Sequence, residues 1–229
     1  MTINKIKGVV WDLDGTLLDS FTVFERIIAD VVKDSGHKMP TRETILLNYH
    51  GSLEECIQKI LGIDSATEVN DVIDIFLDKQ EFHYGGDLQT HLFKDAVDLA
   101  QACAVQDIDQ LLVTNRGNKN RGNASPSFII AATTLSDCIK EIRAGDEVEF
   151  RKPDKRSMGD WLERHELTPE EVLIIGDQFV DAQLAINLGC RAVIVKRNGD
   201  VPHLDNLSQK DHKSIILVDS LEEVVINKS

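Results

Sequence analysis

The stretch GVVWDLDGT, residues 8–16, decides the fold, because it joins an apolar run to a turn that carries two carboxylates. Residues 8–11 are continuously apolar, which is typical of a strand buried on both faces. Asp12, Asp14 and Gly15 follow at once. Two interpretations are open at this point. Asp-Gly between apolar residues often forms a hairpin turn, and two carboxylates at the end of a buried strand can also bind or react with a ligand.

Further apolar runs of the same kind predict the rest of a sheet. They occupy residues 111–114, 172–175, 192–195 and 214–218. Helical patterns separate or follow them at residues 93–104, 157–164, 181–188 and 221–226. Strands that alternate with helices predict an α/β fold, a Rossmann-like doubly wound parallel sheet. Residues 138–144 fit a strand and a helix equally well.

The segment 17–87 has a different character. Helical periodicity covers residues 21–33, 41–49, 53–61 and 68–82, and Gly85-Gly86 marks a return. We predict an all-α cap domain at residues 17–87, inserted after the first strand of an α/β core formed by residues 1–16 and 88–229. An insertion there lies beside the carboxyl ends of the strands, where open α/β sheets bind ligands.

Composition narrows the partners. The 229 residues contain 25 Lys plus Arg and 39 Asp plus Glu, a formal net charge of −14. An acidic chain repels polyanions, so we expect neither nucleic acid nor a membrane surface as a partner. The four cysteines form no CxxC motif, and no signal peptide or long apolar segment is visible. We expect reduced core thiols and a cytoplasmic location; the oligomeric state is left open.

Polar residues elsewhere in the chain, all but Lys152 at or just after the ends of predicted strands, add to the first pair of carboxylates. They are Thr114-Asn115, Lys152 in a basic loop, Gly176-Asp177 and Asp181. Each alone has an ordinary explanation: turn formers, a solvated loop, or a helix N-cap. A parallel sheet, however, would bring the strand ends to one edge.

The combined set predicts a metal-assisted site. Asp12, Asp14, Asp177 and Asp181 would crowd four carboxylates, which cannot all stay ionised unless cations offset them. Oxygen ligands without His or Cys favour Mg²⁺. A carboxylate cluster with a hard metal, a lysine and a strand-end hydroxyl suits phosphoryl transfer.

In their order along the chain, these residues resemble four motifs of the haloacid dehalogenase (HAD) superfamily. The motifs are Asp12-Leu13-Asp14-Gly15-Thr16, Thr114, Lys152 and Gly176-Asp177 with Asp181. More narrowly, the chain resembles the phosphoglycolate-phosphatase-like hydrolases with a helical cap. The resemblance implies a Mg²⁺-dependent phosphatase, a phosphoric monoester hydrolase, that hydrolyses a small phosphorylated metabolite through an aspartyl-phosphate.

The resemblance also implies a role for each matched residue. Asp12 would be the nucleophile, Asp14 the general acid and base, and Lys152 the cation that neutralises both nucleophile and phosphoryl group. The phosphate would be bound by Gly15, Thr16, Thr114, Asn115 and Lys152. Mg²⁺ would be held by the carboxylates of Asp12 and Asp177 and the carbonyl of Asp14. Asp181 would orient Lys152 or support the metal ligands.

Other functions remain open. A phosphomutase of the β-phosphoglucomutase type shares these motifs, and a non-catalytic phosphometabolite-binding protein could retain the fold. Asp14 excludes the dehalogenase branch, because halide displacement needs no acid at that position. Residues 116–127 depart from the family pattern, in which a helix begins soon after the second motif. We interpret them as a surface loop; the alternative is a cationic lip that reads an anionic part of the substrate.

Overall fold

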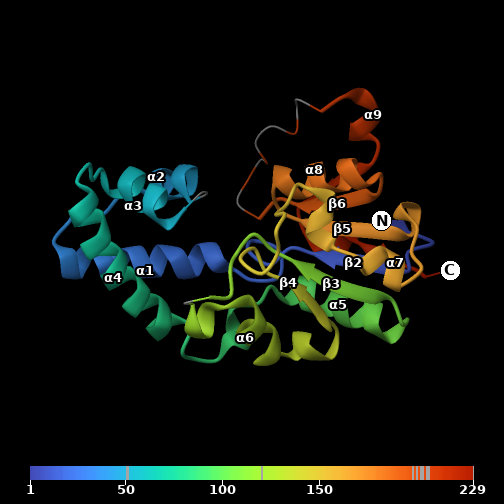
Figure 1. The fold of residues 1–229 in the computed structure, drawn as a ribbon, viewed down its shortest axis with the longest axis horizontal. Helices are drawn as coiled ribbons and strands as arrows, with labels where there is room; N and C mark the ends of the chain where they lie inside the picture. The colour runs from blue at the N-terminus through green and yellow to red at the C-terminus, as the bar shows by residue number, and fades with distance from the viewer. Residues whose placement is uncertain are drawn as a thin grey trace. The chain divides into compact units, whose positions relative to one another are not determined.

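The computed structural model describes residues 1–49, 52–119, 121–197, 199, 201, 204 and 207–228. The chain divides into two compact units (Figure 1). One unit combines Met1–Leu18 with Leu92–Ser229, and the other is Asp19–His91. The second unit contains the helices that the sequence places in an insertion at residues 17–87.

A six-stranded parallel sheet forms the centre of the first unit. Its strands are β2 (Gly8–Trp11), β3 (Asp109–Val113), β4 (Glu141–Arg143), β5 (Val172–Gly176), β6 (Arg191–Val195) and β7 (Ile215–Val218). Their spatial order is β4-β3-β2-β5-β6-β7. The chain therefore adds strands on one side of β2 and then on the other, which makes the carboxyl end of β2 a topological switch point, where ligands bind in such folds.

Helices cover both faces of this sheet, which confirms the doubly wound α/β class. Val10 and Ile174 face a core shared with α7 (Trp161–Arg164) and α8 (Phe179–Leu188). Successive side chains alternate between the faces of a strand, so the neighbouring Trp11 points the other way. Trp11 is fully buried, and its indole N–H donates to Gln110, which in turn donates to a carbonyl of α5 (Lys94–Val105). Figure 1 shows α5 and α8 on opposite sides of the strands.

Two expected helices take a different form. Residues 221–226 were predicted as a helix, and this is wrong: a 3₁₀ turn (Leu221–Glu223) leads into β8 (Val225–Ile226), which pairs with β1 (Thr2–Ile3). The expected helix at 157–164 is interrupted at Gly159, whose φ of +58° is outside the helical range. The ambiguous residues 138–144 contain β4, an edge strand beside β3.

The second unit is all helical. Its helices are α1 (Ser20–Ser35), α2 (Arg42–Asn48), α3 (Leu53–Leu61) and α4 (Ala66–His83), followed by a 3₁₀ turn at Leu88–His91. The Asp19 carboxylate accepts from the backbone N–H of Thr22 and caps the start of α1. Phe24 packs against Phe76 and Tyr49, with ring centroids 5.4 and 5.0 Å away, so aromatic contacts join α1 to α4 and to the end of α2.

The remaining short elements lie in the first unit. They are α6 (Pro126–Ala131), α9 (Gln209–His212) and 3₁₀ turns at Gly122–Ala124, Thr134–Asp137, Lys155–Met158 and Pro169–Glu171.

All four cysteines are free and buried. Burial raises the pKa of Cys103 and of Cys190 to about 12, which leaves these thiols unreactive. Among the described residues, none of the helices has the length and apolar character needed to span a membrane.

Candidate active site

The turn after β2 is folded tightly against the turn after β5. Within it, the Gly15 N–H donates to the Leu18 carbonyl at 2.9 Å, and the Leu18 N–H donates to the Leu13 carbonyl at 2.9 Å. Gly15 has a φ of +77°, and a Cβ at this position would lie 2.1 Å from Asp177 Oδ2. The position therefore requires glycine for both its backbone conformation and the space it leaves. That space lets the two strand-end carboxylates, Asp12 and Asp177, approach one another.

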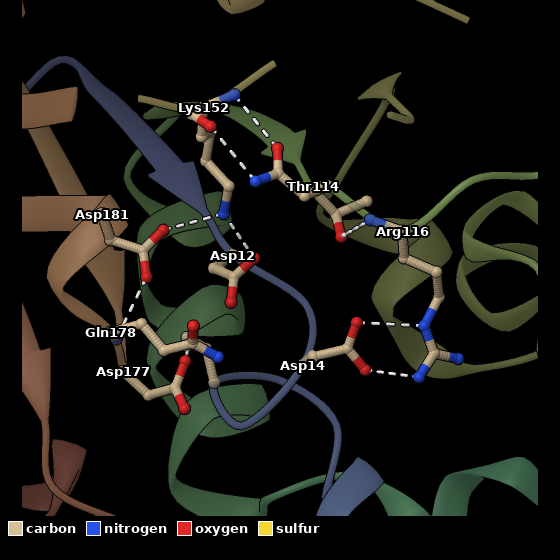
Figure 2. Close-up of polar contacts among 10 residues, drawn as sticks. Asp12, Asp14, Thr114, Arg116, Lys152, Asp177, Gln178 and Asp181 are labelled. Carbon is tan, nitrogen blue, oxygen red and sulfur yellow. Dashed lines mark hydrogen bonds and ion pairs between the residues drawn. The ribbon is translucent and has the colours of Figure 1, made fainter. Parts of the chain in front are cut away.

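Lys152 joins two of the carboxylates in the interior of the site. Its Nζ lies 2.5 Å from Asp12 Oδ1 and 2.7 Å from Asp181 Oδ1, and all three side chains are buried (Figure 2). Burial raises the pKa of Asp12 to about 7; the charge of Lys152 opposes this shift, and the Asp181 and Asp14 carboxylates add to it. Burial alone would lower the pKa of Lys152, but Asp12 and Asp181 outweigh it and hold that pKa above its usual value.

Asp177 brings a further negative charge to the same place. Asp12, Asp177 and Asp181 each offer a carboxylate oxygen, and these oxygens lie within 4.8 Å of one another. Burial raises the pKa of Asp177 well above its ordinary value, and the nearby Asp12 and Asp181 carboxylates raise it further. One lysine does not neutralise three acids, so the cluster has an excess of buried negative charge that a cation would relieve.

Asp181 also has a structural role at the start of α8. Its Oδ2 accepts from the backbone N–H of Gln178 at 3.2 Å, in a capping box. A Cβ on Gly176 would lie 2.3 Å from the Asp181 carboxyl carbon, so the chain needs a glycine there for Asp181 to reach Lys152. The sequence suggested a helix cap and a partner for Lys152 as separate interpretations, and one side chain makes both contacts.

Thr114 and Asn115 lie at the carboxyl end of β3, beside the lysine loop. Thr114 is buried, and its hydroxyl accepts from the Arg116 N–H at 3.1 Å. A hydroxyl that accepts at one lone pair can still donate its proton. The Asn115 side chain pairs with the backbone of Lys152 in both directions: Nδ2 donates to the Lys152 carbonyl at 3.2 Å, and Oδ1 accepts from the Lys152 N–H at 3.0 Å. Asn115 therefore holds the backbone of the lysine loop.

The polar groups of the turn after β2 make contacts within the protein, whereas the sequence suggested that they bind a phosphate. The Thr16 hydroxyl donates to Asp177 Oδ1 at 3.4 Å. The N–H groups of Gly15 and Thr16, which we expected to cradle a phosphate, donate to the carbonyls of Leu18 and Leu13 within the turn. In this structure these two amides shape the turn.

For Arg116, sequence reasoning offered only a surface loop or a cationic lip within residues 116–127, and it missed the residue's partner. Its guanidinium forms a two-pronged ion pair with the Asp14 carboxylate: Nε donates to Oδ2 at 3.0 Å and Nη2 donates to Oδ1 (Figure 2). The Arg116 side chain is only 10% exposed, so this end of the 116–127 segment is not the surface loop that we expected. The signal was present as a cation two residues after Thr114, but nothing in the sequence indicated its partner 102 residues away.

Comparison with known proteins identifies the family. Residues 9–195 match the model of the haloacid dehalogenase-like hydrolases, and the chain belongs to this family. The match spans the strand-end residues described above, from Asp12 to Asp181. The resemblance drawn from the four motifs is thus confirmed, and the chain is a hydrolase.

Individual relatives are similar over most of their length. A phosphoglycolate phosphatase of Aliivibrio fischeri is 28% identical over 194 residues, which cover 82% of each chain. A phosphoglycolate phosphatase of Thiobacillus denitrificans is 27% identical over 188 residues, 81% of each chain. The crystal structure of a predicted phosphoglycolate phosphatase from Haemophilus somnus superposes with a TM-score of 0.74 at 19% identity, covering 96% of both chains, and shares the fold.

Proposed function

We propose that this protein is a Mg²⁺-dependent phosphatase that hydrolyses a small phosphorylated metabolite through a phosphoryl group carried on Asp12. The observation that carries the proposal is the buried contact between Asp12 and Lys152, beside Asp177. A carboxylate oxygen can attack phosphorus and form an acyl phosphate, and an ammonium beside it in a dry site can stabilise the negative charge of the transferring phosphoryl group. The phosphoglycolate phosphatases among the relatives support the reaction class.

The reaction has two displacements at phosphorus. In the first, an Asp12 oxygen bonds to phosphorus, the ester P–O bond breaks, and Asp14 gives a proton to the departing oxygen. In the second, a water oxygen bonds to phosphorus, the Asp12–phosphorus bond breaks, and Asp14 takes the proton of the water. Asp14 is thus restored and inorganic phosphate and an alcohol are released. Such acid and base transfer typically contributes about 10²–10⁴-fold.

The residues at the cluster fit a magnesium ion. All the donors are oxygens, as Mg²⁺ prefers, and the buried excess of negative charge needs a cation. We propose that the Asp12 and Asp177 carboxylates and the Asp14 carbonyl would hold it. Bound there, Mg²⁺ would neutralise charge on the phosphoryl oxygens and reverse the upward pKa shifts of the carboxylates.

Lys152 and Thr114 would bind the phosphoryl group from the other side. Lys152 has three N–H donors, of which two contact Asp12 and Asp181. We propose that the third donates to a phosphoryl oxygen, together with the Thr114 hydroxyl. Asn115 would contribute by holding the Lys152 backbone, so Asn115→Ala should lower kcat by about 10-fold if one charge-assisted contact is lost from the transition state.

We further propose that the chain has a catalytic core at residues 1–16 and 88–229 and a cap at residues 17–87. The all-helical composition of the unit Asp19–His91 and its insertion between β2 and β3 support a cap. A cap would exclude water and select the substrate, as closing elements commonly do. An acidic chain with such a site suits a small phosphorylated metabolite, and we propose that the protein acts in the cytoplasm.

Phosphate release tests the proposal. The purified protein is incubated with an aryl phosphate and with sugar, nucleotide and small-acid phosphates, in Mg²⁺ or in EDTA, beside Asp12→Asn. We expect metal-dependent release by the wild type and none by the variant, whose thermal unfolding confirms that it is folded. Release at the wild-type rate by Asp12→Asn would overturn the mechanism. Conversion of a sugar phosphate to its isomer, without release, would indicate a mutase.

A further inference from the structure

In the structure, the proposed general acid Asp14 is engaged in an ion pair with Arg116. Both oxygens of the Asp14 carboxylate accept from the guanidinium, Oδ2 from Nε at 3.0 Å and Oδ1 from Nη2. In Figure 2 the Asp14 carboxylate points toward Arg116, while Lys152, Asp12 and Asp181 form a separate group. With both oxygens directed at the guanidinium, the Asp14 carboxylate is turned away from Asp12, beside which a departing alcohol oxygen would lie. The pair therefore has to open before Asp14 can act.

Arg116 is itself held firmly. Its Nη1 donates to the Ala124 carbonyl at 2.9 Å, its backbone N–H donates to the Thr114 hydroxyl at 3.1 Å, and its carbonyl accepts from the Gly145 N–H at 2.9 Å. The guanidinium is therefore fixed by its own chain, two residues from the hydroxyl that we assign to the phosphoryl group. The Asp14 side chain is 21% exposed, against 10% for Arg116, so Asp14 is the partner more accessible to solvent.

An anion that reaches Arg116 would compete with Asp14. Arginine binds carboxylates and phosphates in the same two-pronged geometry, so either can replace the Asp14 carboxylate oxygen for oxygen. A substrate with one phosphoryl group at Asp12 and a second anionic group at Arg116 would release Asp14 as it binds. A substrate without that group would have to open the ion pair with nothing to replace it.

We propose that Arg116 is a specificity-determining residue. Its ion pair keeps Asp14 from acting as the general acid until the second anionic group of a substrate, a carboxylate or a second phosphate, binds the guanidinium. The inference rests on the proposed phosphatase function and narrows its substrates to phosphomonoesters with two anionic groups. Arg116 recognises the charge, and the same event frees the Asp14 carboxylate, which takes a proton from solvent and then serves as the general acid. Binding energy from a remote part of the substrate is thereby expressed in kcat.

Matched substrates test the proposal. The probes are phosphoglycolate, which has a carboxylate, its neutral carboxamide, and ethylene glycol bisphosphate. For the wild type we expect kcat/KM on the better charged probe to exceed that on the amide by at least about 30-fold, in line with a buried charge pair. Whether the carboxylate or the bisphosphate is preferred identifies the second anion.

Substitution of Arg116 should change the activity on charged substrates and on the neutral amide in opposite directions. In Arg116→Met, kcat/KM on the preferred charged probe should fall by about 30-fold or more, while kcat on the amide rises because Asp14 is no longer held. Arg116→Lys, with a point charge and no fork, should retain part of the preference. Lys119→Met removes an exposed cation of the same segment and should leave the wild-type preference unchanged.

The outcomes separate this inference from the function on which it rests. Equal losses on all probes in Arg116→Met would mean that the ion pair only supports the fold, and an unchanged preference would mean that Arg116 does not read the substrate; either overturns the inference. In both cases, Mg²⁺-dependent hydrolysis of an aryl phosphate by the wild type would leave the phosphatase function intact. If the wild type hydrolyses no phosphomonoester, the proposed function fails first.

Discussion

The ammonium of Lys152 lies 2.5 Å from a carboxylate oxygen of Asp12, and the two side chains are 3% and 8% exposed. A buried ion pair of this kind stabilises the folded protein only while both charged side chains are present. Removing the lysine leaves Asp12 and Asp181 buried without their cation.

We therefore predict that Lys152→Met lowers the free energy of unfolding by about 3 kcal/mol and lowers kcat by at least about 100-fold, as loss of an electrostatic stabiliser does. Denaturant unfolding and steady-state kinetics measure the two effects. Lys155→Met, at an exposed lysine three positions on, is the control and should leave both unchanged. Equal behaviour of the two variants would contradict the role of Lys152.

The absence of a side chain at Gly15 is a condition for the site. Ala at this position would adopt a φ of +77° at a cost of about 1–2 kcal/mol, and would also place a Cβ 2.1 Å from Asp177. Gly189→Ala is a matched control, because Gly189 has a φ of +81° and nothing lies within 4 Å of its Cβ position. We predict that Gly15→Ala alone abolishes phosphate release, although both variants lose some stability. Activity in Gly15→Ala like that of Gly189→Ala would show that Asp177 can move aside without consequence.

Magnesium should stabilise the protein through the acidic cluster. At a concentration of about 100 times Kd, a ligand specific to the folded state adds about 2.7 kcal/mol. We predict a corresponding rise in Tm with Mg²⁺ that is absent in Asp177→Asn. Because burial raises the pKa of Asp12 to about 7, protons compete with the metal, and the apparent affinity should weaken as the pH falls through this value. An identical Tm shift in Asp177→Asn would place the metal elsewhere.

A second ion pair, between Asp95 and Arg197, should govern part of the acid stability. Two guanidinium nitrogens of Arg197 lie 2.8 and 2.7 Å from the Asp95 oxygens, and Arg197 also stacks on Phe93 at 4.0 Å. Burial would raise the pKa of Asp95, but the Arg197 contacts and the Leu221 N–H outweigh it and hold that pKa below its usual value. Its stabilisation is therefore fully present above the unfolded-state pKa and is lost as the pH falls through the lower, folded-state pKa.

Asp95→Asn should accordingly lower the free energy of unfolding by about 2 kcal/mol near neutral pH, as loss of hydrogen bonds to a charged group does. The difference from the wild type should shrink as the pH falls below about 4. Asp98→Asn, which breaks only an exposed pair on the same helix, is the control and should show neither effect. A difference that stays constant down to acid pH would contradict the charge argument.

The sequence predicts the main sheet closely because its signal is local. Continuous apolar runs mark β2, β5 and β6 to within a residue, since a parallel strand buried on both faces admits no polar positions. The short edge strand β4 (Glu141–Arg143) is half-buried and carries two charged residues, so its pattern leaves the choice open. The helix predicted at 221–226 is wrong because β8 is defined by pairing with β1 at the far end of the chain, which no local pattern reports.

The contacts of the candidate site also divide into those that a local sequence signal predicts and those that depend on tertiary packing. Asp12, Thr114 and Asp177 can be placed together from sequence, because the carboxyl ends of neighbouring parallel strands share an edge. The partners of Asp14 and Asn115 cannot, because Arg116 and the Lys152 backbone reach them only through the folding of loops. Hydrogen-bond partners between loops depend on tertiary packing, and the residue types alone allow many pairings.

The central claim is that the phosphoryl group passes through Asp12. The most direct test is to measure the mass of the protein after an acid quench. Wild-type protein is mixed with excess substrate and Mg²⁺, quenched in acid within the turnover time, and analysed intact and as peptides by mass spectrometry. We predict one added phosphoryl group, located at Asp12 and absent from Asp12→Asn. Steady turnover with no phosphoryl group on the protein, or with one at another residue, would contradict the account.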